Sequence, residues 1–214
     1  MKSILLIGLG RFGYNVAVNL SEMDAEVLAI DIDEKKVENV LPYVTRAQIG
    51  DCTNPNYIDT LGVENFDSCI VGIGDDFQSS LEITSLLKEY GAKRVISRAV
   101  TEIHAKFLTK NGADAVVYPE KQLAEWTAMR CASDHIIDFF ALDKEYSVFE
   151  IPVYDEWCEK KIVDLDIRRK HHLNIIAIKK DGKLNMNFGA DTVLHKDETI
   201  MVVGKNADIK KSYI

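Results

Sequence analysis

The feature that most constrains the fold is a glycine-rich turn near the start of the chain, GLGRFG at residues 8–13. It follows the apolar run Ile4–Ile7 and precedes a segment with helical periodicity, so it lies where a strand turns into a helix. Gly8 permits a tight turn, Gly10 lets the backbone approach a pyrophosphate, and Gly13 lets the helix pack closely on the strand. The turn therefore predicts a βαβ unit whose helix N-terminus binds phosphates.

An acidic residue at the expected distance supports this interpretation. Asp31 ends the second apolar run, Val27–Asp31, where a carboxylate can accept hydrogen bonds from ribose hydroxyls. We therefore expect a ligand with an unmodified 2′-hydroxyl, which disfavours NADP. The alternative is an α/β fold without nucleotide, in which the glycines serve turn geometry alone.

The pattern of alternating strands and helices continues to residue 118 and predicts an α/β fold, a Rossmann-like doubly wound parallel sheet. Its runs are apolar on both faces, so helices should cover both sides of the sheet. Further strands are expected at Arg46–Ile49, Ser68–Ile73, Arg94–Ser97 and Ala115–Tyr118, and helices from near Arg11, Glu34, Asn56, Gln78 and Glu102.

The alternation of strand and helix patterns ends at residue 118. Pro119 suits the first turn of a connecting helix, predicted over 119–134. Residues 135–214 read as a second, smaller α+β domain with a turn at 180–183 and one strong helix at Ile162–His172. Its strands are expected at Tyr146–Val153, Ile175–Lys179 and Thr199–Val203.

Composition excludes several classes of protein. The net charge of −8 disfavours nucleic acid as a partner. The longest apolar runs are far shorter than the roughly 20 residues that cross a bilayer, and no signal segment precedes the first strand, so a cytoplasmic protein is expected. The 4 cysteines form no CxxC pair, which points to free thiols and a reducing compartment.

Two more short segments follow predicted strands. They lie at the carboxyl ends of the strands, which is the edge where open parallel sheets bind ligands. Gly50-Asp51 follows the third strand, and residues 72–76 follow the fourth, so both should border the adenine and ribose. Asp51, Asp75 and Asp76 are alternatively helix N-caps, and we expect only Asp51 to contact ligand. Arg11 places a cation inside the glycine turn, which allows a triphosphate, so ATP or ADP competes with NAD.

The sequence favours ligand binding over catalysis. About 80 residues of second domain leave little material for a substrate pocket, and none of the 5 histidines lies in a recognisable catalytic pattern. The alternative is a small NAD-dependent oxidoreductase, because it would use the same glycine turn and Asp31. A purely structural protein with permanently bound nucleotide is a third alternative.

An ordered set of motifs carries a resemblance to a known family: GLGRFG at 8–13, VLAIDID at 27–33, QIGDCT at 48–53, IGDD at 73–76, VVYPEK at 116–121 and the ending IMVVG at 200–204. Together they resemble the RCK (regulator of potassium conductance) proteins, in particular the Ktr/Trk-type cytosolic subunits of bacterial potassium uptake systems. The resemblance covers the whole chain as an N-terminal RCK domain (1–118), a crossover helix (119–134) and a C-terminal RCK domain (135–214).

The resemblance implies a regulatory subunit and not an enzyme. It implies homodimers that assemble into an octameric ring, located in the cytoplasm at the inner face of the membrane on an embedded potassium-translocating subunit. Exchange of ATP for ADP, or of NADH for NAD, would change the ring's shape. The implied nucleotide-contacting residues are Gly8, Gly10, Arg11, Phe12, Gly13, Asp31, Asp33, Asp51, Cys52, Ile73, Gly74 and Arg98.

Some implied roles leave alternatives open. Arg11 matches a position that reaches a γ-phosphate across the dimer, whereas Asp51 is more similar to nicotinamide-binding relatives, so both nucleotide classes stay open. Glu120 matches a residue that holds Mg²⁺ or a monovalent cation, or it suits a helix start. A cyclic di-AMP site is implied at Ile162, Ile167, Arg168, Arg169, Asn174 and Ile175, with a core helix and strand as the alternative.

Overall fold

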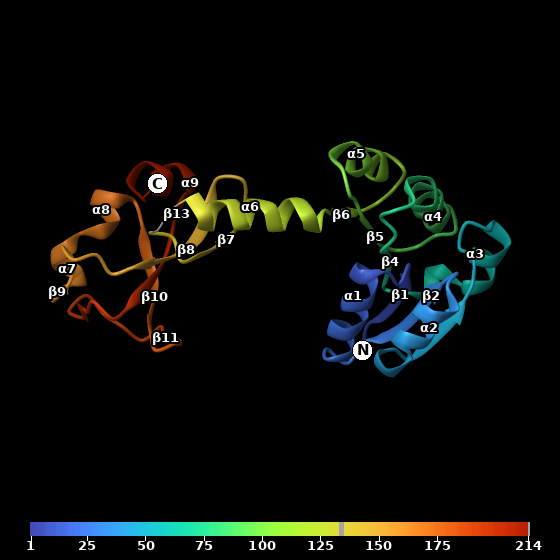
Figure 1. Ribbon diagram of the computed structural model, residues 1–214, viewed down its shortest axis with the longest axis horizontal. Coiled ribbons are helices and arrows are strands. Elements are labelled where there is room, and N and C mark those ends of the chain that lie inside the picture. Colours follow the sequence, from blue (N-terminus) through green and yellow to red (C-terminus); the bar gives the residue numbers. More distant parts are fainter. Residues whose placement is uncertain (133–134, 214) are drawn as a thin grey trace. The chain divides into compact units, whose positions relative to one another are not determined.

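The computed structural model describes residues 1–132 and 135–213, which divide into two compact units, Met1–Lys121 and Gln122–Ile214 (Figure 1). Each unit has its own sheet and its own apolar core. The predicted end of the connecting helix at 133–134 lies outside the described residues. Within the described ranges, no helix is long and apolar enough to cross a bilayer.

The first unit is built on a parallel sheet of six strands in the order β3-β2-β1-β4-β5-β6. Neighbouring strands β1 and β4 send the chain to opposite sides of the sheet, which creates a switch point at their carboxyl ends. The strands are β1 (Ser3–Ile7), β2 (Glu26–Asp31), β3 (Arg46–Ile49), β4 (Ser68–Val71), β5 (Val95–Arg98) and β6 (Ala115–Val117). The helices are α1 (Arg11–Ser21), α2 (Glu34–Val40), η1 (Leu41–Tyr43), α3 (Pro55–Leu61), η2 (Val63–Asn65), α4 (Phe77–Glu89) and α5 (Glu102–Lys110).

Alternate residues of each central strand enter two separate cores, one on each face of the sheet. On β1, Leu5 and Ile7 pack in the core that α3 and α4 cover, whereas Ile4 and Leu6 pack in the core that α1 and α2 cover. The doubly wound α/β fold predicted from the sequence is thereby confirmed. The prediction of apolar runs on both faces was wrong for β3, because this strand lies at the edge of the sheet and exposes Arg46 and Gln48.

Helix α6 (Pro119–Ala132) carries the chain from the first unit into the second, and it begins at the proline that the sequence indicated. The second unit has a five-stranded antiparallel sheet, β11-β10-β13-β8-β7, and a separate pair, β12-β9. These strands are β7 (Asp138–Ala141), β8 (Tyr146–Pro152), β9 (Lys160–Lys161), β10 (Asn174–Lys180), β11 (Lys183–Asn185), β12 (Val193–Leu194) and β13 (Thr199–Lys205). Its helices are α7 (Ile162–Leu165), α8 (Ile167–His171) and α9 (Asn206–Tyr213).

The turn and the helix predicted for this unit had different outcomes. The β10–β11 hairpin turns at Asp181 and Gly182, both with positive φ as a two-residue turn requires, so that prediction is confirmed. The single helix at 162–172 is wrong, because Asp166 takes φ 50° and divides it into α7 and α8. Leu165 and Ile167 are both buried, and residues two apart on one helix point to nearly opposite sides, so the break lets both reach the core.

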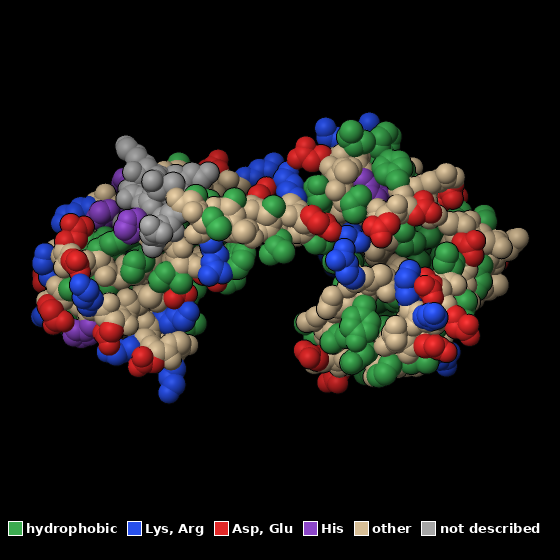
Figure 2. Space-filling model, in the orientation of Figure 1, with side chains coloured by type: hydrophobic (Ala, Val, Ile, Leu, Met, Phe, Trp, Pro, Cys, Tyr) green, Lys and Arg blue, Asp and Glu red, His purple; other side chains and the backbone are tan. Residues whose placement is uncertain are grey.

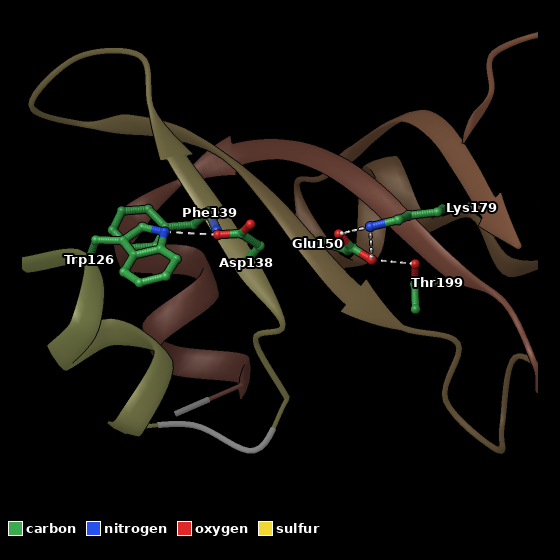
Figure 3. Close-up of polar contacts among 6 residues, drawn as sticks. All are labelled: Trp126, Asp138, Phe139, Glu150, Lys179 and Thr199. Carbon is green, nitrogen blue, oxygen red and sulfur yellow. Dashed lines mark hydrogen bonds and ion pairs between the residues drawn. The ribbon is translucent and has the colours of Figure 1, made fainter. Parts of the chain in front are cut away.

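A buried carboxylate links three strands of the second sheet. Glu150 of β8 is 8% exposed and accepts hydrogen bonds from Lys179 Nζ on β10 at 2.9 and 3.1 Å, and from Thr199 Oγ1 on β13 at 2.7 Å (Figure 3). The Lys179 side chain is 33% exposed, so about two-thirds of it is shielded from solvent. Figure 3 also shows Trp126 of α6 donating its indole N–H to Asp138 of β7, at 2.9 Å.

Glu150→Ala is expected to lower the free energy of unfolding of the second unit by about 2–3 kcal/mol, because the partly buried Lys179 ammonium and the Thr199 hydroxyl lose their acceptor. Urea unfolding followed by tryptophan fluorescence measures this unit alone, since Trp126 and Trp157 both belong to it. Asp197→Ala is the control: it removes the exposed 2.8 Å pair with neighbouring Lys180 and should cost far less stability. Equal losses would contradict a structural role for Glu150.

A buried histidine lies in the first unit beside the β5–α5 segment. His104 of α5 is fully buried, and neither ring nitrogen has a hydrogen-bond partner among the described residues. Its ring centroid is 4.8 Å from that of Phe77. Burial, with a smaller contribution from the positive charge of Arg98, lowers the pKa of His104 below its ordinary value. The neutral imidazole therefore behaves as an apolar core group.

This lowered pKa predicts acid sensitivity of the first unit. The unfolded chain takes up the His104 proton near pH 6.5 and the folded chain only at lower pH, so stability is complete above about pH 6.5 and falls below it. The loss from this residue is at most about 1.4 kcal/mol per pH unit. In calorimetric unfolding between pH 7 and pH 5, His104→Leu should lose less stability on acidification than the wild type. Parallel pH profiles would contradict the assignment.

Candidate functional site

A cavity of about 990 Å³ opens at the carboxyl ends of β1, β2 and β4, at the switch point of the parallel sheet. This is the position where open α/β sheets bind ligands, and the volume suits a nucleotide-sized molecule. The lining residues come from the loops after β1, β2, β3 and β4, from helices α1, α2 and α4, and from β5. They include Gly8, Gly10, Arg11, Tyr14, Asn15, Asp31, Lys36, Asn39, Asp51, Cys52, Thr53, Ile73, Gly74, Asp75, Asp76, Ser79 and Arg98.

The three glycines of the turn differ in their steric surroundings, and two of them leave no room for a side chain. Gly8 has φ +88°, and a Cβ there would lie 2.6 Å from Ile73 Cγ1. A Cβ on Gly13 would lie 1.9 Å from the carbonyl oxygen of Gly8, so helix α1 could not pack at its present distance from β1. A Cβ on Gly10 would meet no atom within 4 Å. Gly10 is therefore not needed for packing, and its bare backbone faces open space in the cavity wall.

Helix α1 begins at the cavity with its first-turn amides uncapped. Gly10 is the N-cap residue and provides no side-chain acceptor, so the amide donors of the first turn are left for a ligand or water. Arg11 is exposed, lines the cavity and forms no ion pair with the described residues. The positive end of the helix and this cation both favour an anionic ligand.

Asp31 holds the glycine turn in place. It is 7% exposed, its Oδ2 accepts the Leu9 N–H at 2.7 Å, and its Oδ1 accepts the Asp33 N–H at 2.9 Å. Lys36 Nζ lies 3.6 Å from Oδ1. A carboxylate has about four acceptor positions, so capacity remains for a ribose hydroxyl. The geometry adds a loop-ordering role to the ribose role predicted from the sequence.

Most predicted nucleotide-contacting residues line the cavity: Gly8, Gly10, Arg11, Asp31, Asp51, Cys52, Ile73, Gly74 and Arg98. Three predicted residues do not. Gly13 acts through packing on Gly8, Asp33 caps α2 by accepting the Lys35 N–H at 2.9 Å, and Phe12 places its ring 5.8 Å from the Arg98 guanidinium carbon. Their expected contacts with nucleotide stay a prediction.

Two acidic residues at the cavity, Asp51 and Asp76, are held in their charged form by local hydrogen bonds. Hydrogen bonds from the Thr53 hydroxyl and amide lower the pKa of Asp51, and those from the Ser79 hydroxyl and amide lower the pKa of Asp76. Asp76 is the N-cap of α4, as its alternative interpretation stated. Burial raises the pKa of the Cys52 thiol to about 12, so this cysteine is a neutral wall group and not a nucleophile.

Sequence reasoning missed one cation of this site. Lys36, in the first turn of α2, lines the cavity beside Asp31. A signal was present, since Lys36 lies one turn beyond the N-cap Asp33 in the helix that follows the ribose-side strand. Tyr14, Asn15 and Asn39 were also missed, because their side of α1 and α2 could not be assigned from one sequence.

Arg98 and Glu120 form an ion pair at the edge of the cavity, with Nη2 and Oε1 2.5 Å apart. The pKa of Glu120 is lowered by a backbone hydrogen bond at its own position and by Arg98. Among the described residues there is no group of three or more His, Cys, Asp or Glu placed to hold a metal ion. The expectation that Glu120 holds a cation stays a prediction.

The residues predicted for a second ligand site lie in the second unit. Ile167 is buried and Ile162 and Ile175 pack against the same core, as the alternative interpretation of a core helix and strand requires. Arg168, Arg169 and Asn174 are exposed. The basic end of α8 thus lies next to the start of β10.

Comparisons with known proteins agree for both units. Residues 4–119 match the model of the TrkA-N domain, and residues 147–213 match that of the TrkA-C domain. The chain is 38% identical over 210 residues to "Ktr system potassium uptake protein C" of Bacillus subtilis (strain 168), covering 98% of this chain and 95% of that protein. It is 34% identical, with the same coverage, to "Ktr system potassium uptake protein A" of the same organism.

A solved structure described as "GsuK channel bound to NAD" shares the fold of this chain. It superposes with a TM-score of 0.70 at 16% identity, covering 97% of this chain and 38% of that one. The chain therefore spans little more than a third of that channel. At this identity, the likeness establishes the fold alone.

The three glycines yield a matched pair of variants. Gly13→Ala should lower the free energy of unfolding of the first unit by more than about 2 kcal/mol, because its Cβ overlaps the Gly8 carbonyl oxygen. Gly10→Ala should stay within about 1 kcal/mol of wild type, since Gly10 has φ −63° and open space around it. Differential scanning calorimetry measures both, and a similar loss at both positions would contradict this division of roles.

Proposed function

The chain belongs to the RCK family of potassium uptake proteins that combine a TrkA-N with a TrkA-C domain, and on this premise we propose that it is a cytosolic nucleotide-binding subunit that regulates a bacterial potassium uptake system. The observation that carries the proposal is the cavity at the switch point, bordered by an uncapped helix N-terminus and by three cationic side chains. Such a site suits a ligand with several phosphates.

We propose an adenine nucleotide as this ligand. The phosphates would lie on the amides after Gly10, within reach of Arg11 and Arg98, and the ribose would face Asp31. Three cations favour ATP or ADP as the exchanging pair. NAD and NADH are the competing pair, supported by Asp51 at the rim and by the fold of a channel described as bound to NAD.

The regulatory step is a difference in affinity between two shapes of an oligomer. A ligand that bound both shapes equally would shift nothing, whereas a coupling of about 1–3 kcal/mol changes affinity roughly 5- to 150-fold. Arg11 supplies such a difference if it reaches the γ-phosphate of a nucleotide held by a second copy. Its exposed position and lack of an ion-pair partner among the described residues support this role.

The proposed assembly is a homodimer that forms an octameric ring on a membrane-embedded potassium-translocating subunit, at the inner face of the membrane. Exposed apolar side chains support association. Helix α6 has no buried residue, and Leu123 on it is 62% exposed. Phe77, Ile103 and Phe107 are exposed around α5, and Figure 2 shows hydrophobic side chains on the surfaces of α5 and α6. Exposed apolar side chains such as these, present on each unit, support association with further copies.

Two finer ligand proposals follow from the family. Glu120 would hold Mg²⁺ or a monovalent cation beside a bound triphosphate, since a half-exposed carboxylate at the cavity edge can reach both. Cyclic di-AMP would bind at Arg168, Arg169 and Asn174, where cations and an amide are exposed together in the second unit. Cyclic di-AMP is anionic, in keeping with the exposed cationic side chains of α8.

Binding, and not catalysis, is the proposed activity. No histidine lines the cavity in the described part of the chain, and its one thiol, that of Cys52, is held neutral by burial. No observation favours the alternative of a small NAD-dependent oxidoreductase. The regulatory role needs differential binding alone.

The phosphate-reading role of Arg11 can be tested by calorimetric titration of the full chain with ATP and ADP. Arg11→Gln should weaken ATP about tenfold, because one charged contact to the γ-phosphate is lost, and should change ADP less than about threefold. Lys35→Gln is the control, since it removes the same charge from α2 outside the cavity lining and should change neither affinity.

Two results would overturn the proposed function. One is a wild-type chain with no affinity for ATP, ADP or NADH at millimolar concentration. The other is hydride transfer between NADH and a carbonyl substrate at ordinary enzyme rates, above about 1 per second. If small-angle scattering shows the same assembly with ATP and with ADP, the proposed change of shape is wrong, whereas the proposal of nucleotide binding is unaffected.

A further inference from the structure

The Arg98 guanidinium lies between the cavity and the first turn of α6. Arg98 ends β5, lines the cavity, and is only 14% exposed. A Cβ on Gly74 would lie 2.8 Å from Arg98 Nη1, so the guanidinium passes directly over this glycine. The guanidinium carbon also lies over the ring of Phe12, in the glycine turn, 5.8 Å from the ring centroid. Packing of this kind holds the cation at the rim of the phosphate region.

The hydrogen bonds of Arg98 are incomplete. Its Nη2 donates to Glu120, and its Nε is buried without a partner among the described residues. An arginine has five N–H donors, and a bidentate anion satisfies more of them than a single carboxylate oxygen does. Arg98 therefore has both the charge and the spare donors to bind a phosphate from the cavity.

The two partners of this ion pair differ in how easily they can move. Arg98 is held on several sides, whereas the Glu120 side chain is 54% exposed at the start of a helix with no buried residue. A phosphate that entered the cavity would therefore keep Arg98 in place and displace Glu120. The glutamate, ionised at neutral pH, would then leave Arg98 and face water or a cation held beside the phosphate.

A second ion pair joins the first turn of α6 to the segment after β5. In this pair α6 contributes the cation, whereas in the first pair it contributes the anion. Lys121 Nζ of α6 lies 2.6 Å from Oε1 of Glu102, the first residue of α5. Residues 98–102 thus provide a cation for Glu120 and an anion for Lys121. Neither Glu102 nor Lys121 lines the cavity, so the second pair is independent of ligand.

We propose that Glu120 occupies Arg98 as an internal competitor of ligand phosphate, and that a phosphate which takes Arg98 releases the first turn of α6 from the nucleotide-binding unit. This inference rests on the proposed function, because it needs an anionic ligand in the cavity. Glu120 is a positioning residue in this scheme: it lowers phosphate affinity through Arg98 and makes α6 sensitive to whether the site is filled. Since α6 continues into the second unit, its first turn is the part of the helix that the ligand can reach.

The test compares ATP with adenosine, which has no phosphate, by calorimetric titration of the full chain in EDTA. Glu120→Gln keeps the shape and removes the competing charge, so ATP should bind about three- to fivefold tighter and adenosine should be unchanged. In an Arg98→Gln background, Glu120→Gln should have a clearly smaller effect on ATP, because only the weaker charge interaction with Arg11 remains. Glu102→Gln, which removes the carboxylate of the sister ion pair, is the matched control and should leave ATP affinity unchanged.

Three results would overturn the inference: weaker or unchanged ATP binding by Glu120→Gln, an equal effect in the Arg98→Gln background, or an equal effect of Glu102→Gln. Hydrogen exchange on the wild type gives a second measure that needs no variant. Amides 121–124 should exchange faster with saturating ATP than with saturating adenosine, and equal rates would count against release of the helix. If wild-type protein binds neither compound, the proposed function fails and this inference fails with it; if ATP binds normally and the variants show none of these effects, only the inference fails.

Discussion

The hydrogen bond from the Leu9 amide to the buried Asp31 carboxylate is the contact on which the site depends. It ties the turn after β1 to the end of β2, so the glycine turn and the ribose-side strand are positioned by one interaction. The second oxygen of Asp31 fixes the Asp33 amide, one residue before α2 begins. A carboxylate that accepts two backbone N–H groups in a buried place is costly to replace, because both donors would be left without an acceptor. The glycine turn and the end of β2, two sides of the cavity, are therefore joined through one carboxylate.

Sequence patterns predicted the first unit well, because its geometry is set by local sterics. Gly8 and Gly13 are needed wherever a strand, a tight turn and a helix approach so closely, and the alternation of Ile4 to Ile7 between two cores is visible as a run of apolar residues. The second unit was harder, because its short strands β7, β9, β11 and β12 are two to four residues long and carry no clear period. The break at Asp166 is set by the burial of Leu165 and Ile167, a tertiary requirement that helix periodicity does not show.

The same distinction explains the candidate site. Residues that follow strands in the sequence, such as Gly74 and Asp51, were located from chain order alone, because parallel strands end at one edge. Phe12 and Asp33 belong to the same motifs but point elsewhere, one toward Arg98 and one to the α2 amides. Which side of a turn a residue occupies depends on side-chain packing, and a motif does not specify it. The pairing of Arg98 with Glu120 joins positions 22 apart in the chain and has no local signal.

Helix α6 combines the absence of a buried side chain with ion pairs in its first turn. A helix of 14 residues without a buried side chain gains little from packing within its own chain, so contacts at its two ends decide its position. The first turn is held by two ion pairs whose partners on α6, Glu120 and Lys121, are half-exposed, so their side chains can be displaced at small cost. Farther along, Trp126 donates to Asp138 and Met129 packs against the second core. The helix is therefore held weakly at its first turn and by packing at its other end. Displacing the first turn costs little energy, whereas displacing a fully buried helix would cost much more.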